Sequence, residues 1–160
     1  MERKDKTNYY LDIADTVSRR STCIRRQYGA IIVRNDEIIA TGYNGAPRGR
    51  KNCLDLGFCE RERQNIPSGQ RYELCRSVHA EANAIISAAR RDILGGILYL
   101  VGREYDTGVL LTDTTSCAMC RKMIINAGIV KMIARTGEED YTVTEMRDWV
   151  FNDDSLTGWL

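Results

Sequence analysis

The sequence is short of histidine and proline, and it has no long hydrophobic run. One histidine, His79, and two prolines occur in 160 residues. The longest apolar stretches, such as GAIIV and GILYLV, fall well below the roughly 18 residues that a membrane helix needs. The charged N-terminus is also unlike a secretory signal. We therefore expect no membrane contact and a cytoplasmic location.

The sequence also has no large excess of positive or negative charge. Basic residues number 23 and acidic residues 22, for a net charge of +1. Proteins that bind polynucleotides usually present a basic face, so we expect no polynucleotide partner. One small phosphorylated molecule remains compatible with this balance. The six cysteines are unsuited to disulfides in a reducing compartment and are more typical of metal ligands or catalytic thiols.

No internal repeat or flexible linker appears, so we expect a single domain over residues 1–160. Hydrophobic periodicity predicts helices over residues 8–19, 78–91 and 116–128, and a last helix capped by Thr144. Two β-rich runs around Asn35 and Asp36 indicate a hairpin. Further strands are expected at 95–102 and 129–135, with room for a short hairpin at 103–115. A long structured loop fills 44–77. This order predicts an α/β fold, with helices covering a mixed sheet.

The stretch SCAMC places Cys117 and Cys120 at the start of a predicted helix. Positions three apart share a helical face, and a helix N-terminus favours thiolates. A redox pair or two buried thiols are the alternatives, but a redox pair has no use for a distant His-x-Glu. With His79, the pair supplies three ligands and leaves a fourth position open, as in catalytic zinc sites.

Glu81 follows His79 by two residues, so it can reach a zinc-bound water without ligating the metal. Such a carboxylate takes a proton from the water and returns it to a ring nitrogen and a leaving amine. The alternative is a first-turn carboxylate that only complements the helix dipole. A His-x-Glu followed by C-x-x-C is the signature of zinc nucleobase deaminases.

These motifs carry a family resemblance. Cys23 followed by YGAIIV, then GYNGAPRGRKNC, HAEANAIISAARR and CAMCRKMIINAGI, resemble the deoxycytidylate (dCMP) deaminases of the cytidine deaminase-like superfamily. The likeness runs over roughly residues 9–135. It implies a three-layer fold with about five strands and helices on both faces. It also implies hydrolysis of dCMP at C4 to dUMP and ammonia, which feeds thymidylate synthesis.

The resemblance also assigns residues. Zinc is held by His79, Cys117 and Cys120, and Glu81 shuttles protons. Asn44 binds the nucleoside, Ala80 lets the base approach the backbone, and Arg90 contacts the 5′-phosphate through its guanidinium. For Arg90 alone, an exposed helix arginine is the alternative.

The family commonly forms a hexamer and is regulated by dCTP and dTTP with Mg²⁺. Arg48, Arg50 and Lys51 form a basic patch that fits a triphosphate effector, or else a solvated charge run. Some members carry a second, structural zinc. Here its ligands would be Cys23, Cys53, Cys59 and Cys75, and the alternative is buried free cysteine.

Two departures from the family pattern bear on the substrate pocket. Ser116 stands where the family usually has proline before the first cysteine of the pair, which removes a constraint on φ. About fifteen residues also separate Val101 from Cys117, where the usual connection is nearly direct. These departures leave room for another nucleoside, nucleobase or nucleotide as substrate, such as a free nucleoside, guanine or tRNA adenosine. A non-catalytic zinc domain that serves as an interaction module is the competing class.

Overall fold

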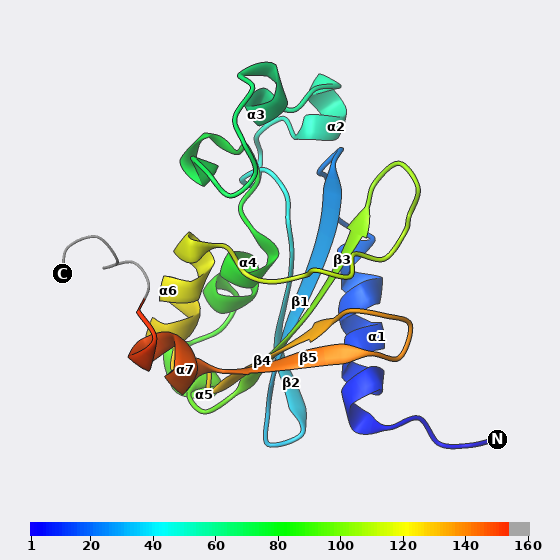
Figure 1. Ribbon diagram of the computed structural model, residues 1–160, viewed down its shortest axis with the longest axis vertical. Coiled ribbons are helices and arrows are strands. Elements are labelled where there is room, and N and C mark those ends of the chain that lie inside the picture. The colour runs from blue at the N-terminus through cyan, green and yellow to red at the C-terminus, as the bar shows by residue number, and fades with distance from the viewer. Residues whose placement is uncertain (154–160) are drawn as a thin grey trace.

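The computed structural model describes residues 1–153 and is built on one mixed five-stranded sheet (Figure 1). The strands are β1 (Arg26–Arg34), β2 (Glu37–Tyr43), β3 (Ile97–Glu104), β4 (Lys131–Arg135) and β5 (Tyr141–Glu145), in the order β2-β1-β3-β4-β5. The pair β3–β4 is parallel and the other pairs are antiparallel. The expected mixed sheet is therefore confirmed.

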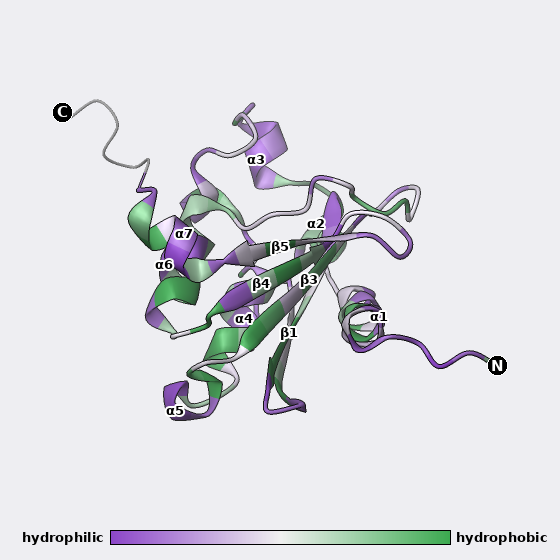
Figure 2. Cartoon of the chain, turned by 60° about the horizontal axis from the view of Figure 1, so that its bottom comes forward, coloured by the Kyte–Doolittle hydropathy of each residue, from purple (hydrophilic) through white to green (hydrophobic). Residues whose placement is uncertain are grey.

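Helices cover both faces of this sheet, as expected. α1 (Lys6–Ser18) lies on one face, and α4 (Ala80–Ile86), α5 (Arg90–Ile93) and α6 (Ala118–Asn126) lie on the other (Figure 1). Successive residues of β1 point to opposite faces: Ala30 and Ile32 pack under α4, whereas Ile31 and Val33 pack under α1. Figure 2 shows hydrophobic stretches along β1, β3 and β4 in the middle of the domain.

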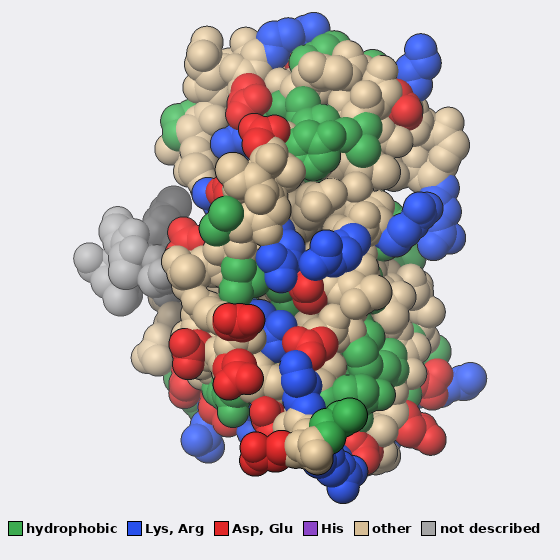
Figure 3. All heavy atoms as spheres, turned by 90° about the vertical axis from the view of Figure 1, so that its right-hand side faces the viewer, with side chains coloured by type: hydrophobic (Ala, Val, Ile, Leu, Met, Phe, Trp, Pro, Cys, Tyr) green, Lys and Arg blue, Asp and Glu red, His purple; other side chains and the backbone are tan. Residues whose placement is uncertain are grey.

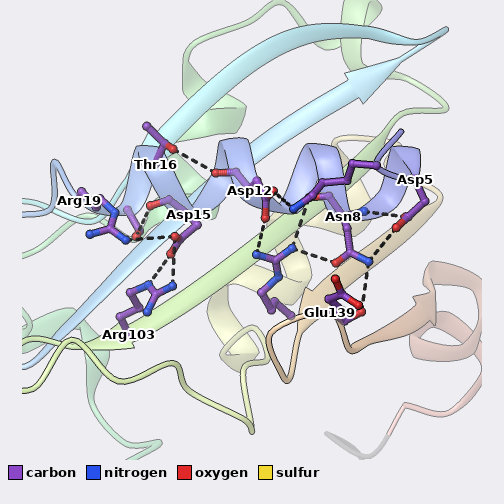
Figure 4. A network of polar contacts seen from close by, with 11 residues as sticks. Asp5, Asn8, Asp12, Asp15, Thr16, Arg19, Arg103 and Glu139 are labelled. Atoms are coloured by element: carbon purple, nitrogen blue, oxygen red, sulfur yellow. Dashed lines mark hydrogen bonds and ion pairs between the residues drawn. The ribbon is translucent and has the colours of Figure 1, made fainter. Parts of the chain in front are cut away.

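Ion pairs fasten α1 to the sheet (Figure 4). Asp15 on α1 pairs with Arg103 on β3. Arg135 on β4 is 4% exposed, and it donates to Asp12 at 2.8 Å and to the side chain of Asn8 at 2.9 Å. Removing one partner of a buried charge pair leaves the other charge uncompensated, so these contacts fix the position of α1.

Gly42 brings α4 close to the sheet. A Cβ at this position would lie 2.3 Å from both the carbonyl oxygen of Ala80 and the amide nitrogen of Ala84. Only glycine leaves room for this approach. The first turn of α4, which follows His79, therefore rests directly on β2.

The segment between β2 and α4 is a structured lobe at one end of the sheet (Figure 1, top). It holds α2 (Cys53–Leu56), α3 (Glu60–Arg63) and a 3₁₀ turn (Tyr72–Leu74). Asn52 begins α2 with a capping box formed with Asp55. The long loop predicted from the sequence thus contains short helical turns.

Some element boundaries differ from the sequence-based predictions. The hairpin at Asn35 and Asp36 is confirmed, with φ of 51° and 63°. The predicted helix 78–91 is instead two helices, because α4 ends at Ser87, whose hydroxyl bonds back to the carbonyl of Asn83. Thr144 lies in β5, and the last described helix, α7 (Met146–Phe151), begins after Glu145. No helix among residues 1–153 is both long and apolar enough to cross a membrane.

Candidate metal centre and substrate cavity

His79, Cys117 and Cys120 meet between the N-termini of α4 and α6. Their ligand atoms all lie within 4.8 Å of one another, and the His79 Nδ1 is 3.4 Å from each sulfur. His79 is the residue before α4, and Cys117 is the residue before α6. Helix starts therefore aim all three donors at one point, as the motif spacing predicted.

The two thiols lie close enough for each to shift the pKa of the other. A hydrogen bond between them lowers the pKa of Cys117 and raises the pKa of Cys120. Burial alone would lower the pKa of His79, but hydrogen bonds to Cys117 and Cys75 outweigh it and raise that pKa. The Cys117 sulfur also accepts the backbone N–H of Cys120 at 3.4 Å. The local field thus favours negative charge on sulfur next to the imidazole.

Glu81 faces this donor group. The side chain is buried, with 5% exposure, and burial raises the pKa of its carboxyl. The carboxyl group lines the same cavity as His79 and Cys117, and the Ser116 hydroxyl donates to Oε1 at 2.7 Å. A carboxylate that is buried beside three metal-type donors has the placement of a proton carrier.

A cavity of about 400 Å³ opens onto this group. Its wall includes His79, Ala80, Glu81, Ser116 and Cys117, together with residues from the start of β1 and from the lobe. Ala80 is fully buried in the wall. Cavities of this size with a few convergent polar groups are typical of small-molecule sites.

Asn44 also lines the cavity, but its amide is already engaged. Its Oδ1 accepts the backbone N–H of Tyr28 at 2.8 Å, and its Nδ2 donates to the carbonyl of Arg26 at 2.8 Å. Asn44 therefore joins the end of β2 to the start of β1. One Nδ2 proton and the remaining lone pairs are left for a ligand.

Arg90 lies away from this cavity, contrary to the phosphate role expected from the resemblance. Its Nε donates to the carbonyl of Asn126 at 2.8 Å, and it lines a separate groove between α5 and α6. Arg90 is the first residue of α5, which begins after α4 has ended at Ile86. Arg90 thus lines the groove between α5 and α6 and is not among the residues that line the cavity.

The arginines that do line the cavity are Arg25, Arg26 and Arg61. None of the three was predicted from the sequence. The only local sign of a cationic wall was the pair of arginines before Gln27. Arg61 is 5% exposed, its Nη2 donates to the carbonyls of Pro67 and Gln70, and its Nε is buried without a hydrogen-bond partner. Its guanidinium stacks 4.3 Å from the ring centre of Tyr72, whose edge meets the His79 ring.

The other four cysteines and the basic patch form no compact site like that of His79, Cys117 and Cys120. Within residues 1–153, no other group of three His, Cys, Asp or Glu donors lies within 4.8 Å. Burial raises the pKa of Cys53 to about 11, with contributions from nearby Cys23, Cys59 and Cys75. These thiols therefore lie near one another without converging. The patch residues Arg48, Arg50 and Lys51 are exposed.

The donor chemistry fits zinc. Two thiols and one imidazole are the ligands that zinc prefers, and three protein ligands leave one position for a water or substrate. Glu81 stands beside the group without belonging to it. The residues present thus suit a catalytic rather than a structural ion.

Comparisons with known proteins agree with this site. Residues 4–136 match the model of the cytidine and deoxycytidylate deaminase zinc-binding region. The deoxycytidylate deaminase of Schizosaccharomyces pombe is 33% identical over 129 residues, which are 81% of this chain and 36% of that protein. The enzyme of the same name from Mycobacterium phage D29 is 35% identical over 83% of this chain and 96% of its own.

A solved structure has a similar fold. The dCMP deaminase of cyanophage S-TIM5, in complex with dCMP and dUMP, superposes with a TM-score of 0.59 at 28% identity, over 84% of each chain. The chain spans about a third of the fission yeast protein and nearly all of the mycobacteriophage protein. Fold, donor group and sequence match together show that this chain belongs to the zinc-binding cytidine and deoxycytidylate deaminase family.

Proposed function

We propose that this chain hydrolyses dCMP to dUMP and ammonia within one deaminase domain, and so supplies a precursor of thymidylate. The observation that carries the proposal is the buried Glu81 carboxylate facing the group of His79, Cys117 and Cys120. A purely structural metal site has no use for such a carboxylate. The phage relative, nearly all of which the chain covers, is named for this activity.

The chain's own residues supply the proton transfers. Zinc bound by this donor set lowers the pKa of a water toward ~7 and so provides a nucleophile at neutral pH. Glu81 accepts a proton from the water as its oxygen adds to C4 of the pyrimidine. It then gives a proton to N3, and a further transfer to the 4-amino group lets ammonia leave. Overall, dCMP and water become dUMP and ammonia.

A substrate panel tests the proposal. dCMP, CMP, deoxycytidine, dCTP and guanine are incubated with the purified zinc-loaded protein, and ultraviolet absorbance follows the loss of the amino group. We expect dCMP to be the preferred substrate. Turnover of guanine alone would assign another deaminase activity. A folded, zinc-loaded protein that deaminates nothing would favour the interaction module.

Arg61 is the residue that we propose for the 5′-phosphate. It is a buried cation that lines the cavity and makes none of the ion pairs found in the described part of the chain. Arg25 and Arg26 each already pair with a glutamate. A buried charge without an anionic partner is costly even when carbonyls accept some of its hydrogen bonds, and a bound phosphate would compensate it through charge-assisted hydrogen bonds.

Replacement of Arg61 by methionine should therefore lower discrimination between nucleotide and nucleoside. We expect kcat/KM for dCMP to fall about 10- to 100-fold relative to kcat/KM for deoxycytidine, because a hydrogen bond to a charged group contributes roughly 1.5–3 kcal/mol. Because both substrates are assayed with the same preparation, a loss of folded protein lowers both values equally and cancels in their ratio. Arg90→Met is the matched control and should leave the ratio unchanged. Equal losses on both substrates for Arg61→Met would contradict the phosphate role.

A second, structural zinc held by Cys23, Cys53, Cys59 and Cys75 remains part of the proposal. Its support is the proximity of the four thiols, which act on one another's pKa. Their sulfurs would have to draw together around the ion to form a closed tetrahedral site.

Zinc content tests this second site. Elemental analysis should give close to two zinc ions per chain, and Cys53→Ser should lower this to one. One zinc ion per chain, unchanged by Cys53→Ser, would show that these thiols are free.

Assembly and regulation follow the family resemblance. We propose a homo-oligomer, a hexamer by resemblance, and regulation by dCTP and dTTP with Mg²⁺ at Arg48, Arg50 and Lys51. We also propose a cytoplasmic location. Ile86 is 73% exposed beside the apolar groove of α5 and α6, which supports association between chains.

The face in Figure 3 mixes Lys and Arg with Asp and Glu rather than forming one basic field, which supports a small nucleotide over a polynucleotide.

A further inference from the structure

The hydroxyl of Ser116 contacts the proton carrier of the proposed reaction directly. Ser116 is 1% exposed, and its Oγ lies 2.7 Å from Oε1 of Glu81 and 3.3 Å from the sulfur of Met132. A hydroxyl has one proton to donate. Because a carboxylate accepts a stronger hydrogen bond than a thioether does, this proton points to Glu81.

A glutamate side chain needs such a contact if it is to move protons reliably. The terminal torsion of glutamate is broad, so an unrestrained carboxylate rotates. Proton transfer requires one oxygen to stay within hydrogen-bond distance of the water and then of the substrate nitrogens. We propose that Ser116 is a positioning residue that holds Oε1 of Glu81 and thereby leaves Oε2 to carry the proton; this inference rests on the proposed function.

The backbone of Ser116 is itself held in place. Its carbonyl accepts a hydrogen bond from Nε of Arg121 on α6 at 3.0 Å. The guanidinium of Arg121 lies 4.9 Å from the ring centre of Trp149 on α7. Two helices thus fix the turn that precedes Cys117. A fixed backbone gives the hydroxyl a constant direction, which a positioning contact requires.

Steady-state kinetics on dCMP test this role. Ser116→Ala should lower kcat about 10- to 100-fold, as expected for the loss of one hydrogen bond to a charged group, with KM changed less than about 3-fold. Ser116→Thr, which keeps the hydroxyl, should recover most of the rate. Thr114→Ala is the matched control, because its buried hydroxyl reaches the carbonyl of Leu111 and not Glu81. All variants should retain zinc and the wild-type unfolding midpoint.

The outcomes separate the inference from the function on which it rests. A raised KM with unchanged kcat in Ser116→Ala would overturn the inference and make Ser116 a substrate contact. An active wild type and an equally active Ser116→Ala would also overturn it. If the wild type deaminates none of the panel, the proposed function fails. The contact between Ser116 and Glu81 is then tested by crystal structures alone.

Crystal structures of zinc-loaded wild type and Ser116→Ala provide a readout that needs no turnover. We expect one carboxylate orientation for Glu81 in the wild type, and a rotated or split carboxylate in the variant. The same single orientation in both proteins would overturn the inference.

Discussion

Replacement of Glu81 by glutamine is expected to lower kcat for dCMP by about 10²- to 10⁴-fold, the usual contribution of a general acid–base group. Glutamine has nearly the same shape, and its amide oxygen can still accept the Ser116 hydrogen bond at 2.7 Å. It cannot, however, take a proton from water. The fall in kcat is measured by following the ultraviolet absorbance of dCMP in stopped-time or steady-state assays.

Folding and metal content should survive this change. Burial raises the pKa of Glu81, so ionising this carboxyl costs folding free energy, and a neutral amide in its place should not lower the unfolding midpoint. Glu138→Gln, an exposed site, is the matched control and should keep full activity. A Glu81→Gln variant with wild-type kcat would remove Glu81 from the mechanism.

Replacement of Cys117 by serine is expected to remove the catalytic zinc and, with it, deaminase activity. A hydroxyl is a poor substitute for a thiolate toward zinc. Without the metal, the pKa of water returns from ~7 to its far higher value in bulk solvent, so we expect a loss of at least about 10³-fold. Elemental analysis and the dCMP assay on the same preparation give both quantities.

Cys53→Ser is the matched control for this prediction. It makes the same chemical change at a buried cysteine that lies outside the His79 group. Both variants are expected to lose one zinc ion per chain, but only Cys117→Ser should lose activity. Activity retained by a zinc-depleted Cys117→Ser protein would show that the reaction does not use this metal.

Much of the site could be predicted from the sequence because its chemistry lies in short motifs. Cys117 and Cys120 are three residues apart, so local helix geometry brings them to one face, and His79 and Glu81 lie two residues apart at the start of α4. The lone histidine left one choice for the nitrogen ligand. The hairpin at Asn35 and Asp36 was predictable for the same reason, since a two-residue turn is a local property.

The parts that sequence reasoning missed depend on contacts between distant segments. Arg90 was expected at the cavity from the resemblance alone, whereas the chain leaves α4 at Ser87 and places Arg90 at the start of a separate helix, α5. Ser116 was interpreted only as a missing proline, since nothing local indicates that its hydroxyl meets Glu81, 35 positions away. Arg61 lies in α3, and its place at the cavity depends on its hydrogen bonds to the carbonyls of Pro67 and Gln70 in the loop that follows.

The most direct test of the account follows the oxygen atom. Zinc-loaded protein is incubated with dCMP in ¹⁸O-labelled water, and the products are analysed by mass spectrometry and an ammonia assay. Hydrolysis at C4 predicts dUMP that carries one ¹⁸O, together with one ammonia per dUMP formed. Unchanged dCMP in the presence of folded, zinc-loaded protein would contradict the account.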